Sequence, residues 1–170
     1  EQGLYGSQHY AQAAAARGDD IAGVVICDMV AWYGARYRVD IEGEPAWGWL
    51  MQIMNDACWA YTGLSTNLVY SSWGSDHVPF QDQGYAAFLA IESDFSGYNC
   101  YHQTCDTWDI QMADYGADVT RACLATAAHV AGLPAFYISH TPLESTTNTT
   151  GPYEVLAHLT TLAALAPDSL

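Results

Sequence analysis

The sequence predicts an α/β fold, in which helices cover a sheet that contains parallel strands. Short apolar segments typical of strands alternate along the chain with longer segments of helical periodicity, which is the pattern of the α/β class. In addition, the segment 21–29 is almost continuously apolar. A strand loses the alternation of polar and apolar residues when helices cover both of its faces, so this segment is expected to be a buried strand.

The expected helices are 6–16, 45–61 and 114–131, and the expected strands are 21–29, 36–41, 67–70 and 86–91. Ser7 stands in the position of an N-cap for the first helix, and Gly18 is expected to end it. The last helix has one apolar face, formed by Val119, Cys123, Ala127 and Val130. Gly-Leu-Pro at 132–134 ends that helix, because glycine adopts the left-handed conformation and proline cannot continue a helix.

The composition is that of one globular domain with a strong negative charge. Of the 170 residues, 51% are hydrophobic, which suffices for a core without disulfide staples. Acidic residues outnumber basic ones 19 to 4, and the net charge is -15. Because phosphate binding needs clustered cations, this balance disfavours nucleic acid and anionic membranes as partners and favours cationic solutes, metal ions and amino groups. A saline habitat would select the same balance. No apolar run reaches the length of a membrane span.

The chain changes character near its C-terminus. Residues 139–152 are rich in Ser and Thr and are expected to form a linker after a main domain at 1–138. Within 153–170, apolar residues at 153, 155, 157 and 159 are separated by Glu154 and His158, as in the first strand of a following β module. The chain begins at Glu1 without Met and stops before such a module closes, so we expect it to be truncated at both ends.

The five cysteines include one close pair, Cys100 and Cys105. No C-x-x-C motif suggests a zinc ribbon. Cys27, Cys58 and Cys123 lie in apolar segments and are expected to be small buried hydrophobic residues. One close pair with buried single cysteines fits a secreted or periplasmic protein better than a cytosolic one.

Taken alone, the polar residues leave the chemistry open. Asp28 follows an apolar strand, where α/β proteins place ligand-binding groups, but an aspartate that forms a turn or cap fits equally well. His102 lies between two cysteines among acidic residues, and a structural histidine is the alternative to a metal ligand. Ser-Asp-His at 75–77 is not a catalytic triad, because adjacent residues rarely face one another. The sequence also lacks H-E-x-x-H, G-x-G-x-x-G and P-loop motifs.

Four motifs occur in order along the chain: Glu-Gln-Gly-Leu-Tyr-Gly-Ser at 1–7, Cys-Asp-Met-Val at 27–30, Ser-Asp-His-Val-Pro-Phe at 75–80 and Cys-Tyr-His-Gln-Thr-Cys-Asp-Thr at 100–107. Together they resemble the signatures of the secreted di-zinc aminopeptidases, metallopeptidase family 28, of the bacterial leucyl aminopeptidase type. The resemblance extends to about residue 133. It implies a three-layer α/β/α sandwich around a mixed sheet, here truncated at its N-terminus, with two zinc ions beyond the strand ends.

The resemblance also implies a set of metal ligands. Glu1 and His102 correspond to ligands of one zinc ion, and Asp28 corresponds to a carboxylate ligand of the other. Zinc accepts imidazole and carboxylate ligands together, so this set is chemically consistent. Tyr101 matches the subgroup with a tyrosine before the ligand histidine, whose phenol helps to hold the oxyanion of the tetrahedral intermediate.

Other positions of the motifs match residues close to the family's site. Ser75, Asp76 and Asp106 are assigned to orienting the ligands rather than to binding metal. For Asp76, an N-cap of the following helix is equally consistent with the sequence. Cys100 and Cys105 are expected to form a disulfide that holds Tyr101 and His102 in place.

The implied function is that of a zinc-dependent aminopeptidase acting on peptides or proteins with a free N-terminus. In the family, an H-x-D motif, a bridging aspartate and the glutamate that serves as general base precede the position of Glu1. We therefore expect this chain to be inactive alone. Two alternatives are a glutaminyl-cyclase-like acyltransferase with one zinc ion and a non-catalytic, peptidase-like ectodomain. The motif C-Y-H-x-x-C-D-T at 100–107 favours the peptidase over the cyclase.

Overall fold

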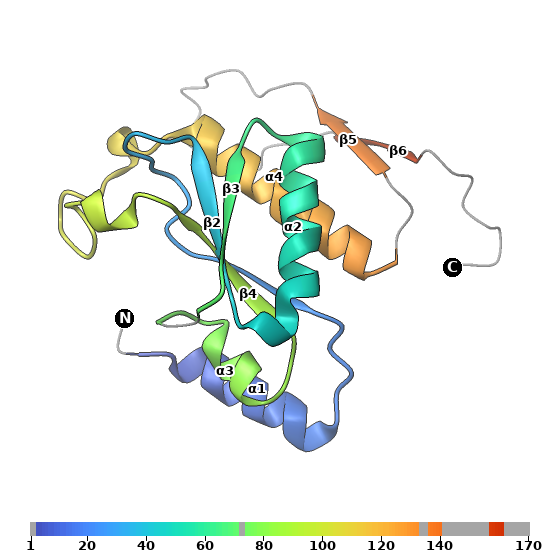
Figure 1. Ribbon diagram of the computed structural model, residues 1–170. Helices are drawn as coiled ribbons and strands as arrows, with labels where there is room; N and C mark the ends of the chain where they lie inside the picture. Colours follow the sequence, from blue (N-terminus) through green and yellow to red (C-terminus); the bar gives the residue numbers. More distant parts are fainter. Residues whose placement is uncertain (1–2, 72–73, 133–135, 141–156, 162–170) are drawn as a thin grey trace, which may run out of the picture. The chain divides into compact units, whose positions relative to one another are not determined.

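The computed structural model describes residues 3–71, 74–132, 136–140 and 157–161, which fall into two compact units divided between Ala131 and Gly132. Glu1 lies outside the described residues. The larger unit has four helices, three short 3-10 turns and four strands in its described part (Figure 1). In chain order these are α1 (Tyr5–Arg17), β1 (Val24–Cys27), β2 (Arg38–Glu42), η1 (Pro45–Trp47), α2 (Gly48–Tyr61), β3 (Ser65–Val69), α3 (Val78–Asp82), β4 (Ala87–Glu92), η2 (Phe95–Gly97), η3 (Trp108–Ile110) and α4 (Ala113–Val130).

The sheet is mixed, as predicted. Its strand order is β1-β4-β2-β3, where β1 runs parallel to β4, β2 runs antiparallel to β4, and β3 runs parallel to β2. Because β1 and β4 are parallel neighbours, their carboxyl ends meet at the same edge of the sheet. Asp28 directly follows β1, and Glu92 is the last residue of β4.

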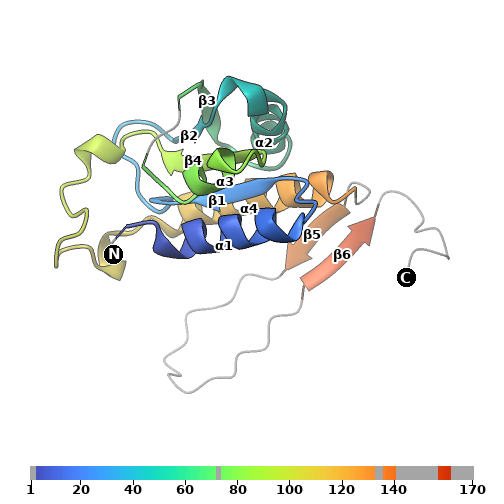
Figure 2. The same cartoon turned by 90° about the horizontal axis from the view of Figure 1, so that it is seen from below.

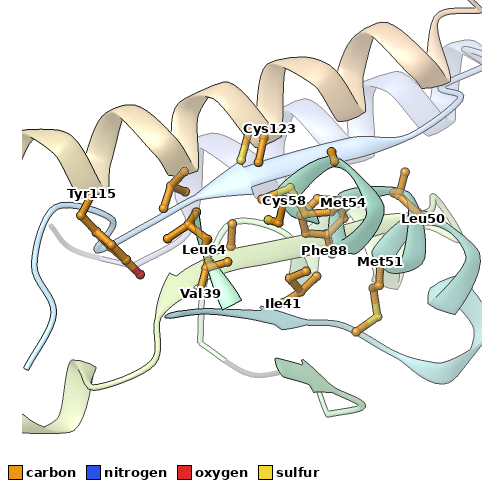
Figure 3. Close-up of a cluster of buried hydrophobic side chains, with 14 of the residues drawn as sticks. Val39, Ile41, Leu50, Met51, Met54, Cys58, Leu64, Phe88, Tyr115 and Cys123 are labelled. Atoms are coloured by element: carbon orange, nitrogen blue, oxygen red, sulfur yellow. The ribbon is translucent and has the colours of Figure 1, made fainter. Parts of the chain in front are cut away.

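Helices cover the sheet on both faces, which gives three layers. On one face α2 and α4 pack together, and on the other α1 and α3 lie side by side (Figure 1, Figure 2). The alternation along β4 shows the division: Phe88 and Ala90 belong to the core under α2 and α4, whereas Ala87 packs with Ala11 and Phe80 from α1 and α3. Figure 3 shows the larger core, in which Met54 and Cys58 of α2 lie close to Phe88.

Two predicted details of the elements are wrong. Ser7 does not cap α1, because Leu4 holds the N-cap position. The Ser7 hydroxyl donates to Asp76 Oδ1 at 2.6 Å, and the Leu4 carbonyl lies 3.1 Å from the same hydroxyl oxygen. Ala127 is exposed, so the buried face of α4 passes through Thr126 instead. Gly18 ends α1 in the left-handed conformation, with φ of 71°, as predicted.

β1 also differs from its prediction. It is half-buried rather than fully buried, and its last residue, Cys27, is exposed. The reason is its position, because β1 is an edge strand among the described residues and pairs with β4 alone. A continuously apolar segment indicates which residues can be buried, but the burial itself depends on what lies beside the strand.

The smaller unit contains β5 (Phe136–His140) and β6 (Ala157–Thr161) in its described part. They pair antiparallel, with Phe136 opposite Thr161 and His140 opposite Ala157. The end of β5 therefore falls within the stretch 139–152 expected as a linker, most of which lies outside the described residues. No helix in the described ranges is long and apolar enough to cross a membrane.

Candidate functional site

A cavity of about 220 Å³ opens where β1 and β4 end. Its lining residues come from the segment after β1, the end of β4 and the loop between β4 and α4: Asp28, Met29, Val30, Ala31, Glu92, Tyr98, Tyr101, His102, Asp106 and Gln111. The carboxyl edge of parallel strands is where α/β proteins commonly bind ligands, because the loops there converge. Four of the residues singled out from the sequence, namely Asp28, Tyr101, His102 and Asp106, meet in this cavity.

Two hydrogen bonds, one to its backbone and one to its side chain, hold Asp28 at the end of β1. Its N–H donates to the carbonyl of Ala90 at 3.2 Å, which continues the pairing of β1 with β4. Ser75 Oγ donates to Asp28 Oδ2 at 2.8 Å. Met29, the next residue, has φ of 51°, which turns the chain sharply after the carboxylate. Ser75 thus orients Asp28, although the two residues are 47 positions apart.

A disulfide between Cys100 and Cys105 closes the loop that carries the other candidate residues. Within this loop the rings of Tyr101 and His102 stack, with centroids 3.9 Å apart and planes 20° apart. His102 has φ of 54°, a left-handed conformation that non-glycine residues seldom adopt. Tyr101 is 51% exposed, so its phenol is accessible to a molecule entering the cavity.

Asp106 is fixed by a triangle of hydrogen bonds at the other wall of the cavity. Tyr98 Oη donates to Asp106 Oδ1 at 2.5 Å, and Gln111 Nε2 donates to the same oxygen at 2.8 Å. Gln111 Nε2 also lies 2.8 Å from Tyr98 Oη. The hydrogen bond to Asp106 raises the pKa of Tyr98, because losing the phenolic proton would place two negative charges together.

Glu92, like Tyr98 and Gln111, lines the cavity but was not singled out from the sequence. Its side chain is 1% exposed, and the Trp32 N–H donates to Oε2 at 3.1 Å. Oε1 is buried and has no hydrogen-bond partner in the part of the chain that the structure describes. The pKa of Glu92 is raised to about 7, mainly by burial; the charges of Asp106 and Asp28 also raise it, and backbone hydrogen bonds to the carboxylate act in the opposite direction. The sequence feature that could have pointed to Glu92 is the one that pointed to Asp28, namely an acidic residue at the end of a continuously apolar segment.

The remaining predicted residues lie elsewhere. Asp76 is not among the residues that line the cavity, and it accepts the hydrogen bond from Ser7. It is not the N-cap of α3 either, since His77 holds that position. His77 is fully buried, and burial lowers its pKa to about 4, against the raising effect of the Asp76 and Asp28 charges. Glu1, the third expected ligand, lies outside the described residues.

The chemistry of the cavity fits part of a zinc site. Asp28 offers a carboxylate oriented by Ser75, and His102 offers an imidazole. Zinc takes both kinds of ligand, in sets of three protein side chains at catalytic sites. No group of three His, Cys, Asp or Glu side chains within the described ranges is placed to hold a metal ion.

Comparison with solved structures finds proteins of similar fold. The aminopeptidase LapA of Legionella pneumophila superposes with a TM-score of 0.66 at 20% identity, covering 76% of this chain and 36% of that one. BSAP, a zinc aminopeptidase of Bacillus subtilis, gives 0.61 at 18% identity, with 76% and 33% covered. An aminopeptidase of Aneurinibacillus sp. strain AM-1 gives 0.56 at 20% identity, with 75% and 30% covered.

These likenesses show a shared fold, and the chain spans about a third of the length of each of these structures. A search of curated proteins finds no match. The model of peptidase family M28 matches residues 1–127, which are most of the chain and include every element from α1 to the greater part of α4. The chain therefore belongs to peptidase family M28.

Proposed function

We propose that this chain forms part of a zinc-dependent aminopeptidase that removes N-terminal residues from peptides and proteins. One observation carries the proposal: the loop closed by Cys100 and Cys105 presents His102 and Tyr101 to the same cavity that Asp28 lines. A carboxylate, an imidazole and a phenolic hydrogen-bond donor thus line the same cavity. Membership of the peptidase family makes hydrolysis of a peptide bond the reaction to test.

Asp28 and His102 would hold zinc, together with Glu1 and with residues outside this chain, and we propose two ions in the complete enzyme. Zinc bound there would act as a Lewis acid that polarises the carbonyl of the scissile peptide bond. Ser75 keeps one oxygen of Asp28 engaged and leaves the other for the metal. The disulfide restricts the loop that carries His102, so less conformational freedom is lost when the metal binds.

Tyr101 is the residue we assign to the reaction itself. Its phenolic O–H donates a hydrogen bond to the oxyanion that develops when the peptide carbonyl becomes tetrahedral. Such a donor accelerates the reaction because it interacts more strongly with the transition state than with the substrate. The stacking of Tyr101 on His102 supports this role, since it keeps the phenol beside the ligand that would fix the metal.

The charge of the cavity favours a substrate with a free amino terminus. Within the described part of the chain, its lining includes the acidic residues Asp28, Glu92 and Asp106 and no Lys or Arg. An ammonium group is attracted to such a space, whereas a carboxylate is repelled. The negative net charge of the chain acts in the same direction. We further propose a secreted or periplasmic location, which would be consistent with the disulfide.

The 170-residue chain is expected to be inactive alone and to bind zinc weakly. The three expected ligands are divided between two ions, and no general base is assigned among the residues present. Isothermal calorimetry with zinc, together with an assay on leucine 4-nitroanilide, measures both properties in the purified chain. Two tightly bound zinc ions, or turnover that a chelator abolishes, would show that the catalytic residues are misassigned.

The proposed orienting role of Ser75 gives a separate expectation. In a protein that also supplies the upstream part of the family's domain, Ser75→Ala should weaken zinc binding by about 10- to 100-fold, because a ligand that loses its hydrogen-bond partner is less well oriented. Ser7→Ala is the matched control, since the Ser7 hydroxyl binds Asp76 and not Asp28. Competition with a zinc chelator measures the affinity. Equal affinities for both variants would show that Ser75 does not orient a metal ligand.

A further inference from the structure

Two cysteines to which the proposed function assigns no role are in direct contact. Cys27 is the last residue of β1, and Cys123 lies on α4, which packs on that strand. Their sulfur atoms are 3.1 Å apart and share an S–H···S hydrogen bond, although the residues are 96 positions apart in the sequence. Cys123 is 8% exposed, whereas Cys27 is exposed and open to reagents in solution.

We propose that Cys27 and Cys123 are a modification site: they form a second disulfide, by exchange with a small-molecule disulfide such as glutathione disulfide. The contact of the two sulfurs supports this, because a bond of about 2.05 Å requires them to approach by roughly 1 Å. Neither sulfur has to leave its place between β1 and α4. The proposal does not depend on the peptidase function.

The exchange proceeds in two steps that balance. The thiolate of Cys27, the exposed partner, attacks one sulfur of glutathione disulfide, which releases one glutathione thiolate and leaves a mixed disulfide on Cys27. Cys123 then gives up its proton, and its sulfur attacks the sulfur of Cys27, which releases the second glutathione. Two protein thiols are oxidised to one disulfide, and one glutathione disulfide is reduced to two thiols.

Cys58 serves as an internal comparison. It is the third free cysteine and belongs to the same core cluster as Cys123 (Figure 3). Cys58 is fully buried, and no hydrogen bond joins its sulfur to either of the other two among the described residues. The proposal therefore names one pair out of the three combinations that these cysteines allow.

The bond would fasten the carboxyl end of β1 to the helix layer. Cys27 directly precedes Asp28, so oxidation would restrain the backbone from which that carboxylate projects. β1 is an edge strand in the described part of the chain, and edge strands have fewer neighbours to hold them. A covalent link from its last residue to α4 would add a second restraint on β1 besides its pairing with β4.

The test uses the chain with Cys100–Cys105 already formed. The protein is equilibrated in buffers of increasing glutathione disulfide to glutathione ratio, quenched by acid, alkylated in denaturant and digested with pepsin at low pH, where exchange is slow. We expect the number of alkylated thiols per chain to fall from three to one. The linked peptide should contain Cys27 and Cys123 and be lighter than the two reduced peptides by two hydrogen atoms. Cys58 should stay alkylated throughout.

Two variants make the assignment specific. In Cys58→Ser the linked peptide should still form, whereas in Cys27→Ser two alkylated thiols should remain at every ratio. Recovery of Cys27 as a glutathione adduct with Cys123 alkylated, or a link from Cys58 to either residue, would overturn the proposal. So would three alkylated thiols in the wild-type chain at the most oxidising ratio.

Discussion

Replacing Tyr101 by Phe in the complete enzyme is expected to lower kcat by about 10²-fold while zinc content stays unchanged, because a single oxyanion donor typically contributes that much. His102→Ala should behave differently and lose metal together with activity, since it removes a ligand. Steady-state kinetics on leucine 4-nitroanilide and metal analysis of the same samples separate the two effects. The neighbouring residues of one stacked pair would thus have distinct roles.

Tyr70 provides the control for Tyr101→Phe. It is 53% exposed, close to the 51% of Tyr101, but it is not among the residues that line the cavity. Tyr70→Phe should leave both kcat and zinc content unchanged, which shows that losing an exposed phenol is not in itself harmful. Full kcat in Tyr101→Phe, or a loss of zinc from that variant, would contradict the oxyanion role.

Glu92→Gln is expected to stabilise the metal-free chain by about 3 kcal/mol at pH 8, because each unit of pKa shift corresponds to roughly 1.4 kcal/mol. The folded-state pKa of Glu92 is about 7, above the ordinary value of 4.5. The folded state therefore keeps a proton that the unfolded state has lost, and stability falls as the pH rises from 4.5 through 7. Glutamine cannot ionise, and its amide oxygen can still accept the hydrogen bond from Trp32.

His77 has the opposite pH dependence. Its folded-state pKa is about 4, below the ordinary 6.5, so stability is lost as the pH falls from 6.5 through 4. In the wild-type chain the effects of Glu92 and His77 on stability have opposite signs over an overlapping range of pH. Without the Glu92 contribution, the Glu92→Gln chain should show the loss of stability at low pH that His77 causes. Urea unfolding at pH 5, 6 and 8 measures this, with the exposed Glu44→Gln as control. A Glu92→Gln chain less stable than wild type at pH 8 would show that the carboxylate is needed for folding.

The sequence predicted the parts of the fold that follow from local pattern. The alternation of apolar segments located α2, α4 and the four described strands of the larger unit to within a few residues. Local pattern drew attention to Asp28, a polar residue after an apolar segment, and to His102, which two cysteines bracket, but it left a structural role open for each. Their assignment as metal ligands came from the family resemblance. The mixed direction of the strands came from family resemblance, since periodicity says nothing about which strands are neighbours.

What the sequence could not predict depends on contacts between distant residues. The hydrogen bond from Ser75 to Asp28 joins a loop before α3 to the end of β1. That Oε1 of Glu92 has no hydrogen-bond partner among the described residues follows from what surrounds it rather than from its place in β4. Cys27 and Cys123 each resembled an ordinary buried cysteine, and only folding brings their sulfurs together.

The left-handed backbone at Met29 and His102 has a consequence for protein engineering. Both positions adopt a conformation that glycine, and to a lesser degree asparagine, accommodates at lower energetic cost, and both lie in the cavity wall. A library selected for thermal tolerance alone should accumulate Gly or Asn at these positions, whereas selection for turnover should retain His102. The two selections would then favour different residues at position 102. The difference in stability between the recovered variants would measure what the protein loses by keeping a histidine there.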